Sequence, residues 1–292
     1  MRLRYSFVID GHPRFLAQGR IFVRTLLAAG VPPGDIVAQV TERSGQAGKR
    51  LAARLRVRAL DLPLGPDRAY CNKINQLFTL ADDDFDVLVC CDTDLAILRP
   101  LDEVARSDAV RARRVDLENP PLSVLEEARA LLGLPERPAL IATGCEPHAM
   151  TYALNCNGGM LLIPRQFVRP LGERWLGYAE TLVANRQIMQ RWVNHIDQVS
   201  WAFAMLRLRL PFEELPVEYN FPIRLAGKVP EQSYGPPVVL HHHNAIGRTG
   251  RIRKSGVALV DRSISEANRR LRPRLGWNFR RLAARFRPTG PP

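Results

Sequence analysis

The chain has 292 residues, of which 46% are hydrophobic and 24% are charged. This composition is ordinary for a soluble globular protein, and the length allows one large domain or two small ones. No stretch approaches the roughly 20 apolar residues of a membrane span, and the polar, basic start lacks the apolar segment of a signal peptide. We therefore expect a cytoplasmic protein. The five cysteines include no C-x-x-C pair, so we expect small buried side chains and neither a disulfide framework nor a structural zinc site.

The net charge of +13 is concentrated near the end of the chain. From residue 247 onward there are thirteen lysines or arginines against two acidic residues, a net charge of +11. The preceding body is then close to neutral, at +2. A basic tail on a neutral body does not indicate a nucleic-acid-binding core, and we expect no nucleic-acid partner.

Strand and helix patterns alternate along the first third of the chain. Apolar runs predict strands at 5–9, 35–40, 57–62 and 86–91, and helical spacing predicts helices at 15–29 and 70–80. This alternation predicts an α/β fold, with a mostly parallel, mixed sheet flanked by helices. Further along we expect a helix at 122–132, an interrupted strand at 152–163, an amphipathic helix marked by Trp192, Ile196, Val199 and Phe203, and a strand at 238–240.

Two carboxylates follow the most apolar of these strands. The run Val87–Cys91 ends at Asp92-Thr93-Asp94. On an extended chain residues i and i+2 point to one side, so Asp92 and Asp94 can face one hard cation. In open α/β sheets this carboxyl edge is where ligands bind. An isolated D-x-D more often only caps a loop, but its position after a buried strand favours a metal site.

A histidine triplet follows the last predicted strand and could complete the metal shell. If the strand stays extended, His241 and His243 share a face and His242 points away. Imidazole beside two carboxylates mildly favours manganese or another transition ion over magnesium. Without the two aspartates, a polar loop that happens to hold histidines would be the simpler interpretation.

Three further segments are candidates for the site, each with a plain structural alternative. Asn157-Gly158-Gly159 interrupts a strand, which marks either a bulge or a close approach of ligand to backbone. Asp197-Gln198 can project from a helix edge into a cleft or belong to a solvated face. Lys73 can offset the charge of a metal and diphosphate, or be a surface lysine.

Taken in order, these motifs resemble the glycosyltransferases of the GT-A fold, and most of all the family-eight, galactosyltransferase-like and glycogenin-like retaining enzymes. The resemblance covers residues 4 to about 250. The matching segments are Ala69–Lys73, Asp92–Asp94, Asn155–Leu161, Asp197-Gln198, Pro216–Asn220 and the strand end at His241. The family's lysine-proline-tryptophan segment after the histidine is absent, and Arg248, Arg251 or Lys254 would have to replace its phosphate contact.

The resemblance implies a role for each matching position. Asp92, Asp94 and His241, with His243 as a further candidate, would hold a divalent metal, Mn²⁺ or Mg²⁺. Lys73 would lie near the diphosphate and sugar, and Asp10 in the nucleotide-base loop. Asn157 and Gly159 would line the donor-sugar pocket. Asp197 would bind sugar hydroxyls, with Gln198 near the anomeric carbon.

The expected activity is transfer of a sugar from a nucleotide-diphosphate donor, with uridine diphosphate favoured by the resemblance, to an acceptor hydroxyl. A divalent metal would stabilise the departing diphosphate as a Lewis acid. No strong general base stands out, which fits a retaining reaction. The alternative enzyme class that uses D-x-D after an apolar strand is the haloacid-dehalogenase-like phosphatases, although Leu95-Ala96 departs from their pattern.

The basic tail supports a non-enzymatic alternative. We divide the chain into a transferase domain at 1–262 and an amphipathic tail at 263–292. Leu275, Phe279, Leu282 and Phe286 recur at helical spacing among arginines, a pattern typical of a helix on an anionic membrane. Such a helix would place the protein at the inner membrane face, as a membrane-associated transferase or as a non-catalytic interaction protein. Docking of the helix on the protein's own body is an equal alternative.

Overall fold

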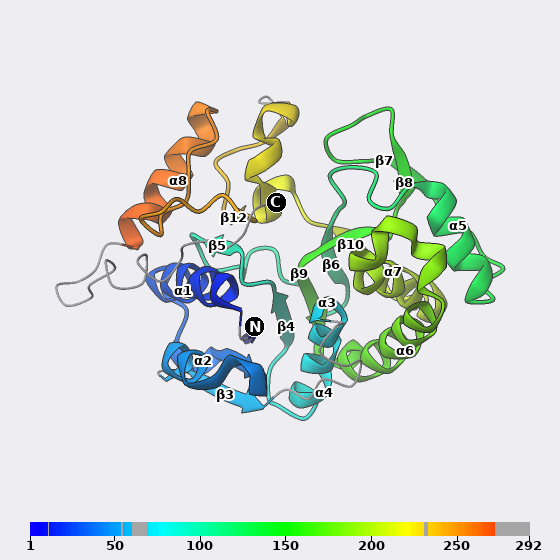
Figure 1. The fold of residues 1–292 in the computed structure, drawn as a ribbon, viewed down its shortest axis with the longest axis horizontal. Coiled ribbons are helices and arrows are strands. Elements are labelled where there is room, and N and C mark those ends of the chain that lie inside the picture. The colour runs from blue at the N-terminus through cyan, green and yellow to red at the C-terminus, as the bar shows by residue number, and fades with distance from the viewer. Residues whose placement is uncertain (11, 54, 60–68, 231–232, 272–292) are drawn as a thin grey trace, which may run out of the picture.

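The computed structural model describes residues 1–292 except 11, 54, 60–68, 231–232 and 272–292. A seven-stranded sheet runs through its centre in the order β10-β6-β9-β4-β1-β2-β3 (Figure 1). Its strands are β1 (Leu3–Ile9), β2 (Ile36–Val40), β3 (Arg56–Ala59), β4 (Val87–Cys91), β6 (Val110–Arg114), β9 (Cys156–Pro164) and β10 (Phe212–Glu214). All neighbouring strands are parallel except β9, which is antiparallel to both β4 and β6. The expected mixed, mostly parallel sheet is confirmed.

Strand β4 is apolar at every position because both faces of the sheet are covered. Leu88 and Cys90 belong to one hydrophobic cluster, whereas Val87, Val89 and Cys91 belong to another on the opposite face. Successive side chains of a strand point to opposite faces, so a strand buried on both sides needs an unbroken apolar run. This packing fixes the end of β4, and with it the position of the two aspartates.

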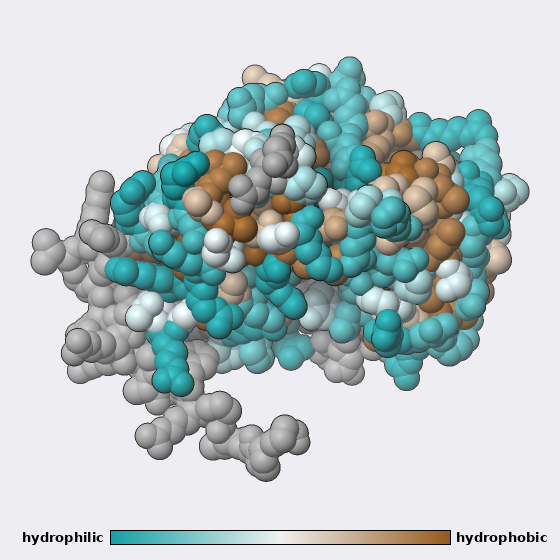
Figure 2. Space-filling model, turned by 90° about the horizontal axis from the view of Figure 1, so that it is seen from above, coloured by the Kyte–Doolittle hydropathy of each residue, from teal (hydrophilic) through white to brown (hydrophobic). Residues whose placement is uncertain are grey.

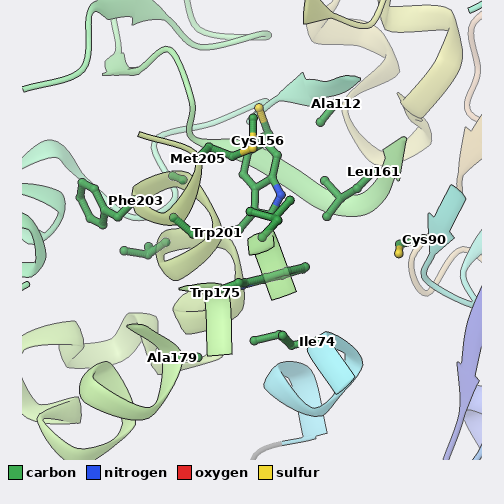
Figure 3. Close-up of a cluster of buried hydrophobic side chains, with 14 of the residues drawn as sticks. Ile74, Cys90, Ala112, Cys156, Leu161, Trp175, Ala179, Trp201, Phe203 and Met205 are labelled. Carbon is green, nitrogen blue, oxygen red and sulfur yellow. The ribbon is translucent and has the colours of Figure 1, made fainter. Parts of the chain in front are cut away.

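Helices cover the two faces of the sheet (Figure 1). On one side lie α1 (Pro13–Ala28) and α2 (Gly45–Ala52); on the other lie α4 (Gln76–Leu80), α6 (Arg165–Ala184) and α7 (Ile196–Leu208), with α5 (Leu122–Leu131) further out. Figure 3 shows labelled side chains of the larger cluster, among them Trp175 of α6 and Trp201 of α7, both buried. The α6–α7 pair is thereby fixed against the sheet.

Two predicted elements are divided in the structure. The helix expected at 70–80 is divided into α3 (Ala69–Asn72), a 3₁₀ turn (Lys73–Asn75) and α4. The strand expected at 152–163 is also divided: β7 (Leu140–Ala142) and β8 (Met150–Tyr152) form a separate hairpin, and β9 begins only at Cys156. At 70–80 the hydrophobic spacing continues along the sequence although the backbone changes direction. At 152–163 the break falls at 153–155, and Asn157-Gly158-Gly159, the interruption expected from the sequence, lies inside β9.

The amphipathic helix expected from Trp192 onward begins later than predicted. Trp192 lies in a 3₁₀ segment (Arg186–His195) with non-helical dihedral angles at Gln190 and at Trp192 itself. The helix α7 starts at Ile196, so Trp192 does not continue the helical stripe of Val199 and Phe203. The apolar spacing was preserved across a kink that periodicity alone does not reveal.

A smaller sheet lies beside the main one. It has the order β11-β12-β5, with β5 (Leu95–Ile97), β11 (Phe221–Pro222) and β12 (Val239–His241). The helix α8 (Ala258–Arg270) packs on this region through a third hydrophobic cluster that includes Val260, Ile264 and Ala267. The predicted domain boundary after residue 262 therefore falls inside α8. The tail positions 275, 279, 282 and 286 lie outside the described residues.

All five cysteines are buried and free, as expected. On the face shown in Figure 2, hydrophobic residues form patches interspersed with hydrophilic ones. Among the described residues, the large hydrophobic side chains that are exposed are Met1, Val57, Tyr70, Leu131, Leu140, Met150 and Val193. Within the described ranges, none of the helices combines the length and the apolar character needed to cross a membrane.

Candidate functional site

The two aspartates of the D-x-D segment lie at the carboxyl edge of the sheet and have different partners. The backbone N–H of Asp92 donates to Gly159 O at 2.8 Å, which continues the β4–β9 pairing past Cys91. The Asp92 carboxylate lies 3.3 Å from Lys73 Nζ, whereas Asp94 Oδ1 lies 3.3 Å from His241 Nε2. Burial raises the pKa of the Asp92 carboxyl. Burial would also raise the pKa of Asp94, but His241 outweighs it and holds that pKa below its ordinary value.

His241 reaches Asp94 because their strands pair. Strand β12 is antiparallel to β5, with His241 opposite Leu95, the residue after Asp94. The other ring nitrogen, Nδ1, lies 3.0 Å from Asn220 Oδ1. An amide oxygen can only accept, so this contact places a proton on Nδ1. In the charged ring, which Asp94 favours, Nε2–H donates to Asp94; in the neutral ring, Nε2 carries the lone pair that a metal ligand needs. Burial lowers the pKa of His241, but the Asp94 charge more than compensates and the pKa is raised.

His243 lies beside His241, although not by the route expected from the sequence. The strand ends at His241, and His243 has a left-handed backbone with φ of 48°. The two rings are stacked, with centroids 3.9 Å apart and an interplanar angle of 3°. Burial lowers the pKa of His243 to about 3 and that of His242 to about 4. The two predicted metal-site histidines are therefore adjacent, but only His241 forms a pair with Asp94.

Lys73 connects the D-x-D segment to α7. Its ammonium group lies 2.7 Å from Asp197 Oδ2 and donates to Gly158 O at 3.0 Å, in addition to its contact with Asp92. Burial opposes the charged form of Lys73, but Asp197 and Asp92 together raise its pKa. Lys73 is thus a buried cation within an acidic site, and the surface-lysine alternative does not apply.

The Asn157-Gly158-Gly159 segment of β9 approaches the site side chains closely. A Cβ at Gly159 would meet His241 Cε1 at 2.6 Å, and one at Gly158 would meet Lys73 Nζ at 2.9 Å. Asn157 Oδ1 accepts a hydrogen bond from Gly159 N at 2.9 Å, and the Asn157 side chain also bonds to Asp116. The pairing of β6 with β9 is irregular here as well. The glycines make room for His241 and Lys73.

The catalytic candidates Asp197 and Gln198 are buried at the start of α7. Trp175 Nε1 donates to Asp197 O at 2.7 Å, which anchors this helix start to α6. Both donors of the Gln198 amide are used: Nε2 bonds to Asn119 O at 2.7 Å and to Asn155 Oδ1 at 3.0 Å. The Gln198 side chain is therefore held in one orientation. Neither residue is on a solvated helix face.

A pocket of about 120 Å³ opens beside these groups. Lys73, Asp92 and Asp94 line it together with Asp10, which follows β1. Asp10 Oδ1 accepts a hydrogen bond from Thr41 at 3.3 Å, and Arg43 Nε lies 3.8 Å from it. The candidates from the ends of β1 and β4 thus line one cavity. Asp197 contacts the lining residue Lys73, and His241 contacts the lining residue Asp94.

The donor set fits a divalent cation in its chemistry. Asp92, Asp94 and His241 supply two carboxylates and one imidazole, and Asn220 holds that imidazole in the tautomer that a metal requires. Across the described part of the chain, no group of three or more His, Cys, Asp or Glu side chains is arranged so that it could hold a metal ion. Asp92 is engaged by Lys73 instead.

Several residues that support the site were not singled out from the sequence. Asn220 orients His241, Asn155 orients Gln198, and Asp116 bonds to Asn157 while forming an ion pair with Arg113. His195 is half-buried and hydrogen-bonds to the Gln198 side chain. Asn155 and Asn220 lie within segments that carried the family resemblance, so their position there was the available signal. Asp116 and His195 gave none.

No protein-family model matches the chain, and no curated protein matches it. Solved structures do match, and together with the strand order they give the chain the GT-A fold of glycosyltransferases. The fold expected from the sequence motifs is confirmed.

Three of the similar structures match most of this chain and nearly all of their own length, at low sequence identity. The galactosyltransferase LgtC, in complex with donor and acceptor sugar analogues, has a TM-score of 0.54 and 16% identity, over 98% of this chain and 97% of that chain. An active-site glutamine-to-glutamate variant of LgtC has a TM-score of 0.54 and 15% identity, and the match covers 90% of this chain and 94% of that chain. The apo form of mouse xyloside xylosyltransferase 1 has a TM-score of 0.50 and 15% identity, and the match covers 83% of this chain and 97% of that chain.

Proposed function

We propose that the protein is a metal-dependent glycosyltransferase that moves a sugar from a nucleotide-diphosphate donor to an acceptor hydroxyl. One observation carries this proposal. The Asp94–His241 pair and the Asp92–Lys73–Asp197 chain of charges meet at the carboxyl edge of the sheet, beside a pocket. In α/β sheets this edge is the ordinary place for a nucleotide. The GT-A fold of the similar glycosyltransferases supports the same reaction class.

Each part of the site has a role in this proposal. Asp92, Asp94 and His241 would hold the divalent metal, with manganese favoured over magnesium because of the imidazole. When bound, the metal would supply Lewis-acid stabilisation of the diphosphate leaving group. Lys73 would contribute a second positive charge near the same group. Asp10 would bind the nucleotide at the far end of the pocket.

The sugar would lie between β9 and the start of α7. Asn157 and Gly159 would line its pocket, and Asp197 would accept hydrogen bonds from its hydroxyl groups. Both N–H donors of Gln198 are used, so its amide oxygen would be the group that faces the anomeric carbon, and the hydrogen bond from His195 would hold that oxygen in place. We propose uridine diphosphate as the donor nucleotide and retention of the anomeric configuration. The similar structures named above are glycosyltransferases and give the phosphatase alternative no support.

Calorimetry with uridine and guanosine diphosphates, with and without Mn²⁺, tests the proposal. The wild type should bind one nucleotide in a metal-dependent manner, and an Asp92→Ala/Asp94→Ala variant should lose that binding. Asp108→Asn, which removes an exposed carboxylate, is the matched control and should bind like the wild type. If neither nucleotide binds the wild type, the proposal fails.

Turnover gives a second test once a donor sugar is found. The Asp94→Asn variant should fold normally, since its contact with His241 can persist as a hydrogen bond, but should lose activity. Unchanged turnover in that variant would contradict the metal role. Release of phosphate from simple phosphomonoesters without a sugar nucleotide would favour the phosphatase alternative instead.

We also propose that the residues after Leu271 bind an anionic membrane surface, as their sequence pattern predicts. The test is sedimentation with vesicles that contain phosphatidylglycerol, at low salt. The intact chain should sediment with these vesicles, and a chain ending at residue 271 should not. Equal sedimentation of the two proteins would assign any membrane contact to the body instead.

A further inference from the structure

The Lys73 ammonium group occupies the space between two carboxylates of the proposed site. It lies 3.3 Å from Asp92 Oδ1 and 2.7 Å from Asp197 Oδ2, and it donates to Gly158 O at 3.0 Å. Its side chain is only 12% exposed, so water screens these contacts weakly. All three donors of the ammonium are directed at oxygen atoms of the site.

The local backbone is built to admit this cation. Lys73 begins the 3₁₀ turn between α3 and α4, where the helix expected from the sequence is interrupted. Opposite it, Gly158 has no side chain, and a Cβ there would lie 2.9 Å from Nζ and 3.3 Å from Asp197 Oδ2. A glycine is therefore needed at this point of β9 for the lysine to reach both carboxylates.

Two cations cannot use the Asp92 carboxylate without cost. Asp94 has a partner in His241, and Asp92 is the second carboxylate of the predicted metal pair. A divalent ion that binds both aspartates would lie close to the buried charge of Lys73, and like charges in a weakly screened site repel strongly. Binding of the ion must therefore displace Lys73 from Asp92 or overcome its repulsion.

We propose that Lys73 is an internal competitor of the metal for Asp92, and that it sets the metal affinity of the nucleotide-free protein. This inference rests on the proposed function. A diphosphate offers Lys73 stronger acceptors than one carboxylate. Donor binding then releases Asp92 to the metal, and the same coupling makes the metal strengthen donor binding, because linkage is reciprocal.

The test is Mn²⁺ binding to the nucleotide-free protein, measured by electron paramagnetic resonance of the free ion. Lys73→Met should bind Mn²⁺ at least tenfold more tightly than the wild type. Lys73→Arg keeps a cation at this position, so its Mn²⁺ binding should remain as weak as that of the wild type. Lys228→Met removes an exposed lysine that pairs with Glu146, and its Mn²⁺ affinity should equal that of the wild type.

Removing Lys73 leaves Asp92 and Asp197 without their cation, which can impair folding. A Lys73→Met/Asp197→Asn variant keeps the net charge of the site and provides a second test. It should also bind Mn²⁺ more tightly than the wild type, because Asp92 is then free. Addition of uridine diphosphate should strengthen Mn²⁺ binding by a larger factor in the wild type than in either variant that lacks Lys73.

The outcomes separate this inference from the proposed function. Equal or weaker Mn²⁺ binding in Lys73→Met and in Lys73→Met/Asp197→Asn, together with loss of Mn²⁺ binding in Asp94→Asn, would overturn the competitor role and leave the metal site in place. An absence of Mn²⁺ binding in every protein, with or without nucleotide, would overturn the metal site and the inference together.

Discussion

His241 directs Nε2 at Asp94 Oδ1 over 3.3 Å, while its Nδ1 is fixed by Asn220 Oδ1 at 3.0 Å. Asp94 and His241 are far apart in sequence and meet because β12 pairs with β5. Asn220 lies at the end of a 3₁₀ turn (Val217–Asn220) just before β11, the other neighbour of β12. The smaller sheet thus carries the histidine and the residue after Asp94, and the turn that leads into this sheet carries the orienting amide.

Removal of the orienting amide should weaken metal binding. Asn220→Ala leaves Nδ1 of His241 without its acceptor, so the ring can rotate or change tautomer. Loss of such a partner typically costs about 10- to 100-fold in metal affinity. Calorimetric titration with Mn²⁺ measures the change. Asn220→Asp keeps an acceptor and should retain the affinity, and Asn244→Ala, on the exposed turn after the histidines, should have no effect.

A side chain at Gly159 should disturb the same histidine. In Gly159→Ala the new Cβ would lie 2.6 Å from His241 Cε1, so the ring must move and the protein should lose both stability and metal affinity. Gly177→Ala is the matched control, because that glycine lies in α6 with open space around it. A helical Gly-to-Ala change there should stabilise the protein by about 0.5–1 kcal/mol. The thermal midpoint should fall in Gly159→Ala and rise in Gly177→Ala. An unchanged midpoint in Gly159→Ala would contradict the close contact between Gly159 and His241.

Replacement of Gln198 by glutamate should destabilise the fold as well as impair catalysis. The Gln198 amide donates to Asn119 O and Asn155 Oδ1, and a carboxylate would place an oxygen against these two acceptors. Leaving buried acceptors unsatisfied costs about 1–3 kcal/mol each. The midpoint of urea unfolding measures the loss. Gln166→Glu changes an exposed glutamine with one hydrogen bond and should stay within about 0.5 kcal/mol of the wild type.

The helix α8 should contribute to the stability of the body. Ile264 is fully buried in the third hydrophobic cluster, so Ile264→Ala should cost about 2–5 kcal/mol of unfolding free energy. Arg262→Ala, on the exposed face of the same helix, should change it by less than about 0.5 kcal/mol. Equal urea midpoints for the two variants would show that α8 is not part of the cooperative core.

The sequence was most informative where one local pattern corresponds to one element. The unbroken apolar run before Asp92 predicted a buried strand that ends at Cys91, and β4 ends at that residue. Periodicity failed at Lys73 and Trp192, where the backbone turns while the hydrophobic spacing continues. Spacing records which side chains face the core, and it does not record how the chain bends between them.

The sequence by itself determined the α/β class and a list of polar candidates at strand and helix ends. It could not determine which candidates touch, because pairing of β12 with β5 and packing of α7 on α6 depend on contacts between distant segments. Only the tertiary structure decided that Asp94 belongs with His241 and Asp92 with Lys73. The physical reason is that hydrophobic burial and strand pairing fix the backbone first, and the buried charges then take the partners that this backbone brings within a few ångströms.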